Sequence, residues 1–124
     1  MTKDRAIELI GIYGKAWENR DADLILSVFT PTATFFDPRE GVKTGHAEIK
    51  AYWESKVIGS QKDILFRLLN VWIDGDAVIA EWNVIFIDTT RNFSIDMTEV
   101  AIFTAEGEFF SSDREYYRSI KAAV

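Results

Sequence analysis

Apolar residues near the start of the chain recur at the spacing of an α-helix: they are Ala6, Leu9, Ile10, Tyr13, Ala16 and Trp17. Positions three and four residues apart share one face of a helix, so this pattern predicts an amphipathic helix over residues 3–19. Asp21 is placed to cap a second, short helix, which ends at Thr30-Pro31. The apolar side chains that this second helix would bury are Leu24, Ile25, Val28 and Phe29.

The middle of the chain predicts a short extended segment, a loop and one more helix. Residues 33–37 are typical of extended chain that Pro38 stops, and residues 41–45 are typical of a loop. A third helix is expected over about residues 46–56, because apolar residues there lie four positions apart on one face.

The second half of the chain changes to a pattern rich in β-forming residues. Strands are predicted near residues 62–73, 77–88, 94–104 and 108–118. Asp74-Gly75-Asp76 joins the first two and is typical of a hairpin turn. Three helices followed by an antiparallel meander predict a single α+β domain over residues 1–124, with the helices packed on one face of a curved sheet.

The predicted strand over residues 77–88 carries apolar side chains on both faces. Trp82, Val84 and Phe86 point to one side, whereas Ile85 and Ile87 point to the other. A sheet with one face in water should alternate cleanly between apolar and polar residues. Since three short helices can cover only one face, we expect a homodimer that forms through the face carrying Trp82, Val84 and Phe86.

Composition narrows the class of function. The net charge is −6 and no stretch concentrates Lys or Arg, so neither nucleic acid nor an anionic membrane is an expected partner. The chain has no cysteine for thiolate chemistry, and its one histidine, His46, leaves no recognisable metal site. No apolar stretch is long enough for a membrane span, and the first residues lack a signal core. We therefore expect a cytoplasmic protein that uses no metal or cofactor.

Three segments of the sequence resemble the NTF2-like superfamily and its SnoaL-like members. They are Tyr13-Gly-Lys-Ala-Trp-Glu-Asn-Arg-Asp21, Ala33-Thr-Phe-Phe-Asp-Pro38 and Thr44-Gly-His-Ala-Glu-Ile49. Glu115-Tyr116-Tyr117 is similar to the last strand of that family. The resemblance covers nearly the whole chain and implies an α+β cone, with three N-terminal helices on a curved antiparallel sheet that encloses one largely apolar pocket. This fold serves isomerases, hydratases, cyclases and non-catalytic binders, so it leaves the activity open.

Ketosteroid isomerase is the member of this superfamily whose catalytic pattern can be followed onto the chain. Its base is an aspartate directly before proline, which implies that role for Asp37. Its oxyanion-hole tyrosine lies on the first helix, eight residues before the capping aspartate, which implies Tyr13. Its second oxyanion donor is a protonated carboxylic acid on the third strand, which implies Glu99. One base and two such donors move a proton α to a carbonyl group.

The residues themselves agree with part of this pattern. Tyr13 lies on the apolar face of its helix, where its hydroxyl needs a buried partner. Glu99 shares a strand face with Met97 and Ala101, and burial there would raise its pKa and favour the neutral, donating form. The bend at Pro38 should leave Arg39 outside the pocket while Asp37 faces into it.

The remaining pocket residues are expected from the cone shape of the family and from strand alternation. Three aromatic residues of the inner core, Trp17, Phe29 and Trp53, would also form the pocket wall. Alternation along the second strand brings in Glu81 and Asn83, and the last strand contributes Asp113 and Tyr116. A bulge near residues 109–112 would leave the register of that strand open, so Asp113 and Glu115 are alternative catalytic carboxylates.

The resemblance implies a cofactor-independent isomerase or cyclase that moves protons on a small apolar carbonyl compound. The alternative is a non-catalytic dimeric module of the same fold that binds a hydrophobic ligand or supports assembly. A third possibility, a hydratase similar to epoxide hydrolases, would require Asp37, Arg67 and Asp113 to meet around a water molecule.

Overall fold

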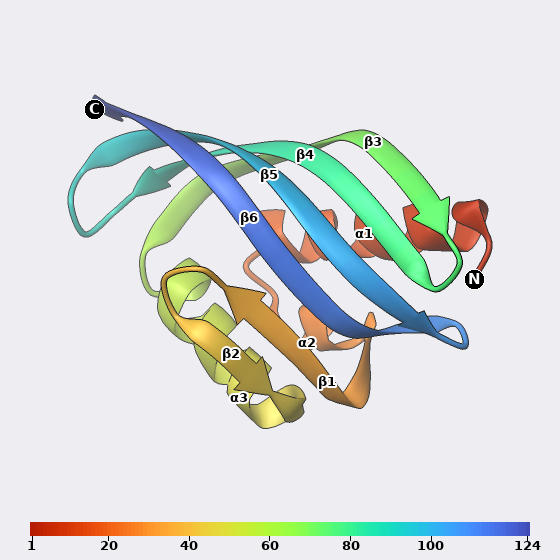
Figure 1. Cartoon of the computed structure of the whole chain (residues 1–124). Helices are drawn as coiled ribbons and strands as arrows, with labels where there is room; N and C mark the ends of the chain where they lie inside the picture. Colours follow the sequence, from red (N-terminus) through yellow and green to blue (C-terminus); the bar gives the residue numbers. More distant parts are fainter.

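A layer of helices packs against a curved six-stranded sheet (Figure 1). The computed structural model describes all residues from 1 to 124. The helices are α1 (Lys3–Glu18), α2 (Ala22–Leu26) and α3 (Gly45–Trp53), and α3 continues into one turn of π-helix, η1 (Glu54–Ile58). The strands are β1 (Phe29–Asp37), β2 (Gly41–Thr44), β3 (Gln61–Asp74), β4 (Ala77–Asp88), β5 (Phe93–Glu106) and β6 (Phe109–Ala123).

The α+β class and the curved sheet are confirmed, but the expected run of three N-terminal helices is only partly matched. α1 is the one long helix, and α3 follows β1 and β2 in the chain. The predicted cap of α2 is present, because the Asp21 side chain accepts a hydrogen bond from the Leu24 amide at 3.0 Å. The helix is shorter than expected, since Phe29 already begins β1. Residues 41–44, expected in a loop, form β2.

The order of strands in the sheet is β2-β1-β6-β5-β4-β3. All neighbouring strands are antiparallel except β1 and β6, whose pairing is parallel and places Phe35 opposite Asp113 and Phe36 opposite Arg114. The expected antiparallel meander is present in β3 to β6, and the parallel pair departs only from the expectation of a wholly antiparallel sheet. It also brings the end of β1, with Asp37, beside the buried half of β6.

The two faces of β4 are the reverse of the sequence-based assignment. Trp82, Val84 and Phe86 are buried on the inner face, so they cannot form a dimer surface. Glu81 and Asn83 lie on the outer face, and the Glu81 carboxylate accepts a hydrogen bond there from Asn70. Because side chains alternate along a strand, choosing the wrong face misplaces every residue of the set at once.

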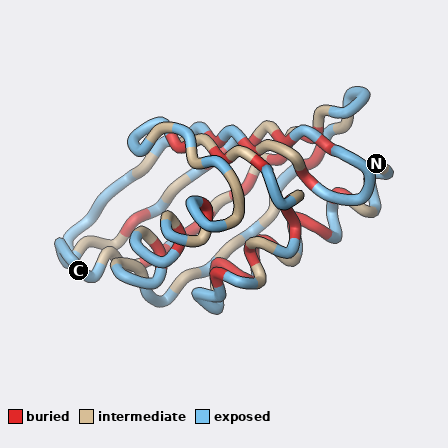
Figure 2. Tube along the Cα trace, turned by 90° about the horizontal axis from the view of Figure 1, so that it is seen from below, coloured by how far each residue is buried: buried red, intermediate tan, exposed pale blue.

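The buried residues gather where the helices and the inner face of the sheet meet (Figure 2). Aromatic rings fill much of this core, and Tyr13 alone contacts the rings of Trp17, Phe29, Trp53, Trp82 and Phe103. α1 approaches β3 closely at Gly14, where an added Cβ would lie 2.3 Å from the Phe66 ring. None of the helices combines the length and the apolar character needed to cross a bilayer.

Candidate active site

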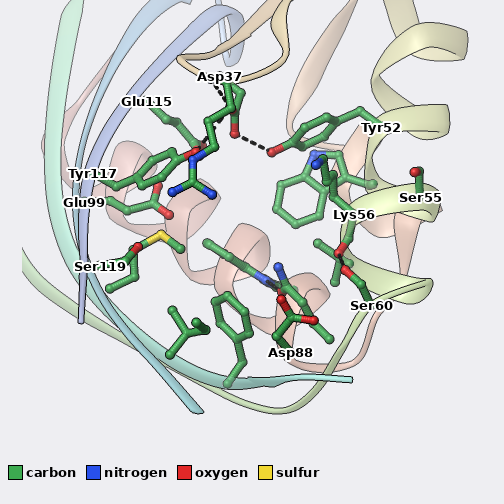
Figure 3. A pocket seen from close by; sticks show the side chains of 18 of the residues that line it. Asp37, Tyr52, Ser55, Lys56, Ser60, Asp88, Glu99, Glu115, Tyr117 and Ser119 are labelled. Carbon is green, nitrogen blue, oxygen red and sulfur yellow. Dashed lines mark hydrogen bonds between the residues drawn. The ribbon is translucent and has the colours of Figure 1, made fainter. Parts of the chain in front are cut away.

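A cavity of about 320 Å³ opens between α3, η1 and the inner face of the sheet (Figure 3). Apolar lining comes from several elements: Trp17, Trp53, Val57, Phe86, Ile95 and Met97. The end of β1 and β6 form a polar wall, and Met97 and Ile95 lie directly beside its Ser119 and Lys121. The cavity is therefore amphipathic, which suits a small molecule with a few polar groups on an apolar body.

Strand alternation builds the polar wall. Every second residue of β6 from Asp113 onward faces inward, and these residues run from fully buried Asp113 through Glu115, Tyr117 and Ser119 to exposed Lys121. Pairing of β5 with β6 places Glu99 directly opposite Tyr117. Two carboxyl groups and one phenol thus meet at the inner end of the cavity.

Asp37 is held at this end of the cavity by four hydrogen-bond donors. Its Oδ1 accepts from the backbone amides of Arg39 and Glu40 at 2.7 and 3.2 Å, and from the Tyr117 hydroxyl at 3.3 Å. Its Oδ2 accepts from the Tyr52 hydroxyl at 2.7 Å. The two backbone bonds come from the turn after Pro38, so the local sequence itself aims the carboxylate.

The two phenols beside Asp37 keep their protons over the physiological range. Burial, together with the nearby Asp37 carboxylate, raises the pKa of Tyr117 to about 12. The same two causes raise the pKa of Tyr52 further above its ordinary value. Both hydroxyls therefore act as donors to Asp37, and neither is available as a base.

A second group of acids, Glu99, Asp113 and Glu115, lies behind and beside Asp37 without a cationic partner. Burial and the charge of Glu115 raise the pKa of Glu99 and that of Asp113 well above their ordinary values. Burial also raises the pKa of Glu115, but its close contacts with the Asp113 and Glu99 carboxyl groups and with the Tyr13 hydroxyl act in the opposite direction. We therefore assign the charge of this group to Glu115, with Glu99 and Asp113 protonated.

Glu99 presents an acidic group to the cavity. It is 2% exposed, it lines the cavity, and its Oε2 has no hydrogen-bond partner. The indole N–H of Trp53 also lacks a partner in the same lining. Buried polar atoms are usually satisfied, so two unsatisfied ones in one cavity indicate where a ligand would bind.

The structure brings some of the predicted catalytic residues together. Asp37 and Glu99 both line the cavity and are close enough for the Asp37 charge to influence the pKa of Glu99. Tyr13 is fully buried behind the lining, and its hydroxyl donates to Glu115 Oε2. Tyr13 can therefore reach a ligand only through Glu115. Arg39 lines the cavity, contrary to the expectation that it would lie outside.

Of the predicted pocket residues, Trp17 and Trp53 line the cavity and five others do not. Phe29 is buried in the core against Tyr13, and Asp113 is buried behind Glu115. The other three are Glu81, Asn83 and Tyr116, which lie on the outer face of the sheet. Tyr116 packs there against Phe36. The reversed faces of β4 explain Glu81 and Asn83, and the register of β6, which the sequence left open, places Tyr116 outside.

Two comparisons with known proteins bear on this architecture. The family model described as the SnoaL-like domain matches residues 12–111. The chain belongs to the SnoaL-like domain family. A search of curated proteins found no match.

Solved structures of NTF2-like proteins and related enzymes share the fold of this SnoaL-like protein. An NTF2-like protein from Anabaena variabilis is 17% identical, with a TM-score of 0.82 over 94% of this chain and 89% of the other. The epoxide hydrolase/cyclase-like enzyme SalBIII, of pyran ring formation in salinomycin, is 24% identical, with a TM-score of 0.76 over 94% and 92%. An LEH-like epoxide hydrolase from Mycobacterium tuberculosis is 15% identical, with a TM-score of 0.75 over 93% and 84%. At these identities the likeness shows the fold.

The structure does not bring together Asp37, Arg67 and Asp113, the three residues that a hydratase similar to epoxide hydrolases would need around a water molecule. Arg67 is exposed on β3, opposite Asn83 of the outer face, whereas Asp113 is buried on the inner face. The sheet itself separates them.

No group of three or more His, Cys, Asp or Glu side chains is arranged to hold a metal ion.

The sequence did not reveal Tyr52 and Tyr117 as partners of Asp37, and it indicated Glu115 only as an alternative. Tyr117 lies two residues after Glu115 on β6, so the two side chains share one face of the strand. With the correct register, the sequence would therefore have predicted Tyr117 in the pocket as well. Tyr52 carries no comparable signal, because its contact with Asp37 depends on how α3 packs on β1.

Proposed function

We propose that this SnoaL-like protein is a cofactor-independent isomerase or cyclase that moves a proton α to the carbonyl group of a small, mainly apolar compound. Asp37 is the base and Glu99 is the acid. The observation that carries the proposal is the unpartnered oxygen of protonated Glu99, which faces the same cavity as the anchored carboxylate of Asp37. One acceptor and one donor in one apolar cavity is the arrangement that general acid–base catalysis requires.

The reaction would run through an enol. Asp37 removes a proton from the carbon next to the carbonyl, and the electron pair of that C–H bond moves to form a C=C bond. Glu99 gives its proton, or a hydrogen bond, to the carbonyl oxygen as negative charge develops there. Where the substrate also carries a C=C bond next to the deprotonated carbon, the intermediate is a dienol; Asp37 then gives its proton to the γ-carbon, the C=O bond re-forms and Glu99 recovers its own proton, so the double bond has moved.

Three buried groups support Glu99 from behind. Glu115 is the charged neighbour that, together with burial, keeps Glu99 protonated. Tyr13 holds Glu115 in place by a hydrogen bond, and buried Asp113 lies close enough for the charge of Glu115 to raise its pKa. Tyr13 is thus assigned a positioning role for the acid, in place of direct contact with the substrate oxygen.

The substitution Glu99→Gln tests the proposal. Glutamine keeps the size and a donor N–H, but it cannot release a proton. We expect the variant to fold and to lower the exchange of the α-protons of butyrophenone with deuterated water by about 10²-fold or more. NMR follows this exchange directly. Exchange at the wild-type rate in Glu99→Gln would exclude Glu99 as the acid, and no catalysed exchange in the wild type would favour a non-catalytic ligand-binding module.

We also propose that the protein forms a homodimer through the outer face of the sheet. Large apolar side chains are exposed there on neighbouring strands: Leu65, Trp72, Ile85, Val100 and Ile120. Light scattering should report twice the chain mass of 14.2 kDa. Val100→Lys places a charge in the middle of this face and should give a folded monomer, whereas a monomeric wild type at micromolar concentration would contradict the proposal.

A further inference from the structure

The mouth of the cavity holds cationic side chains that the proposed proton transfer does not use. Four such residues line the cavity: Arg39, Lys56, Arg91 and Lys121. Lys56 pairs with Glu40 at 3.0 Å, and Arg91 pairs with Asp88 at 3.6 Å. Arg39 and Lys121 form no ion pair. Both side chains are therefore available to a negatively charged ligand in the cavity.

Arg39 is held in place without an anion. Its guanidinium carbon lies over the Tyr117 ring, 5.7 Å from the ring centre. Its backbone amide is fixed by Asp37, at a distance of 2.7 Å. Stacking on an aromatic ring leaves the N–H edge of the guanidinium available, and that edge matches the two oxygens of a carboxylate.

The free groups lie along one line of the polar wall. Tyr117, Ser119 and Lys121 follow one another on the inner face of β6, and all three line the cavity. Ser119 therefore lies between two cations: Lys121 on one side, and on the other side Arg39, which stacks on Tyr117. Glu99 is paired with Tyr117, so Ser119 lies one inward-facing position, about 7 Å along the strand, nearer the mouth than the proposed acid.

We propose that the substrate of this site is a keto acid: its carboxylate binds near Ser119 between Arg39 and Lys121, and its keto oxygen faces Glu99. This inference rests on the proposed function and names the substrate class. The spacing of about 7 Å places a few bonds between the two groups. The apolar wall of Trp17, Phe86 and Met97 then covers the hydrocarbon part.

The carboxylate does not meet uncompensated negative charge at this position. Glu99 is protonated, because burial and the charge of Glu115 raise its pKa. Asp37 is surrounded by two hydroxyl and two amide donors. Glu115 lies deeper than Glu99 and accepts from Tyr13. Asp88, the remaining carboxylate of the lining, is paired with Arg91.

Binding of benzoylpropionate, of its methyl ester and of butyrophenone tests the inference by calorimetry, independently of turnover. All three contain a phenyl ketone, and only the first carries a carboxylate a few bonds away. We expect the acid to bind about tenfold more tightly than the ester, which is the size of one charge-assisted hydrogen bond. Arg39→Gln should reduce the affinity for the acid to that of the ester and leave the affinity for the ester unchanged. Lys121→Gln should have the same effect, but a smaller one.

Arg118→Gln is the matched control, because it removes the same charge from β6 on the exposed outer face. Equal binding of acid and ester, equal loss of both in Arg39→Gln, or no binding of either would each overturn the inference. Failure of the proposed function gives a different result. Benzoylpropionate would then still bind more tightly than its methyl ester, while Glu99→Gln would leave proton exchange unchanged.

Discussion

Replacing Asp37 with asparagine should leave a folded protein that has lost most of its catalysis. Asparagine keeps the oxygen that accepts from the Arg39 and Glu40 amides. In the wild type the Tyr52 hydroxyl donates to Oδ2; in the variant it can turn and accept a hydrogen bond from the amide nitrogen that replaces this oxygen. The side chain no longer accepts a proton, so α-proton exchange should fall by about 10²–10⁴-fold.

The control for Asp37→Asn is Tyr52→Phe, which removes one donor and leaves the carboxylate. We expect it to reduce exchange far less than Asp37→Asn does, because the base is still present and three donors still hold it. The measurements are the NMR exchange rate and the melting temperature. Unchanged exchange in folded Asp37→Asn protein would move the base to Glu115, and loss of folding would make Asp37 a structural cap of the Pro38 turn.

Replacing Asp113 with asparagine should stabilise the protein at neutral pH and have little effect in acid. Asp113 is fully buried, and neither of its oxygens has a hydrogen-bond partner. Burial and the charge of Glu115 raise its pKa well above the ordinary value of 3.8. The folded protein therefore keeps a proton that the unfolded chain releases as the pH rises past that value. The folded state binds more protons, so its stability falls with rising pH.

The stabilisation expected from Asp113→Asn has an upper limit, because the folded wild type retains only one extra proton at Asp113. One retained proton lowers the unfolding free energy by at most about 1.4 kcal/mol per pH unit, or about 4 kcal/mol between pH 4 and pH 7. The Asp113→Asn side chain can donate to Glu115 without taking up a proton, so the substitution removes this penalty.

Urea denaturation at pH 4, 5.5 and 7 measures the effect. The gap in unfolding free energy between Asp113→Asn and the wild type should widen as the pH rises. Asp74→Asn, a matched substitution at an exposed position, should show no such gap. A gap of constant size for Asp113→Asn would mean that Asp113 stays charged in the folded protein.

Local features of the chain were predictable because each depends on residues that are near in sequence. The 3.6-residue period of α1, the Asp21 cap and the Asp74-Gly75-Asp76 turn are decided within a few positions. The resemblance then led to the NTF2-like fold, and it pointed to Asp37 and Glu99, which the structure places in one cavity. Their catalytic roles stay predictions.

The tertiary structure decided which face of each strand is inside. Both faces of β4 are apolar enough to be buried, and α1 covers the one with Trp82. That packing put Glu81, Asn83 and Tyr116 outside. The parallel pairing of β1 with β6 also joins segments about eighty residues apart, as the bond between Tyr117 and Asp37 shows.

The sequence by itself indicated most of the helices and strands, the family and the acids available for chemistry. It could not determine the state of those acids, because a pKa depends on how much water and how many charges surround the group in three dimensions. Only the folded chain places Glu99 and Asp113 around Glu115 without a cation, and leaves Arg39 and Lys121 free at the mouth. The proton of Glu99, on which the proposed chemistry depends, is a property of that packing.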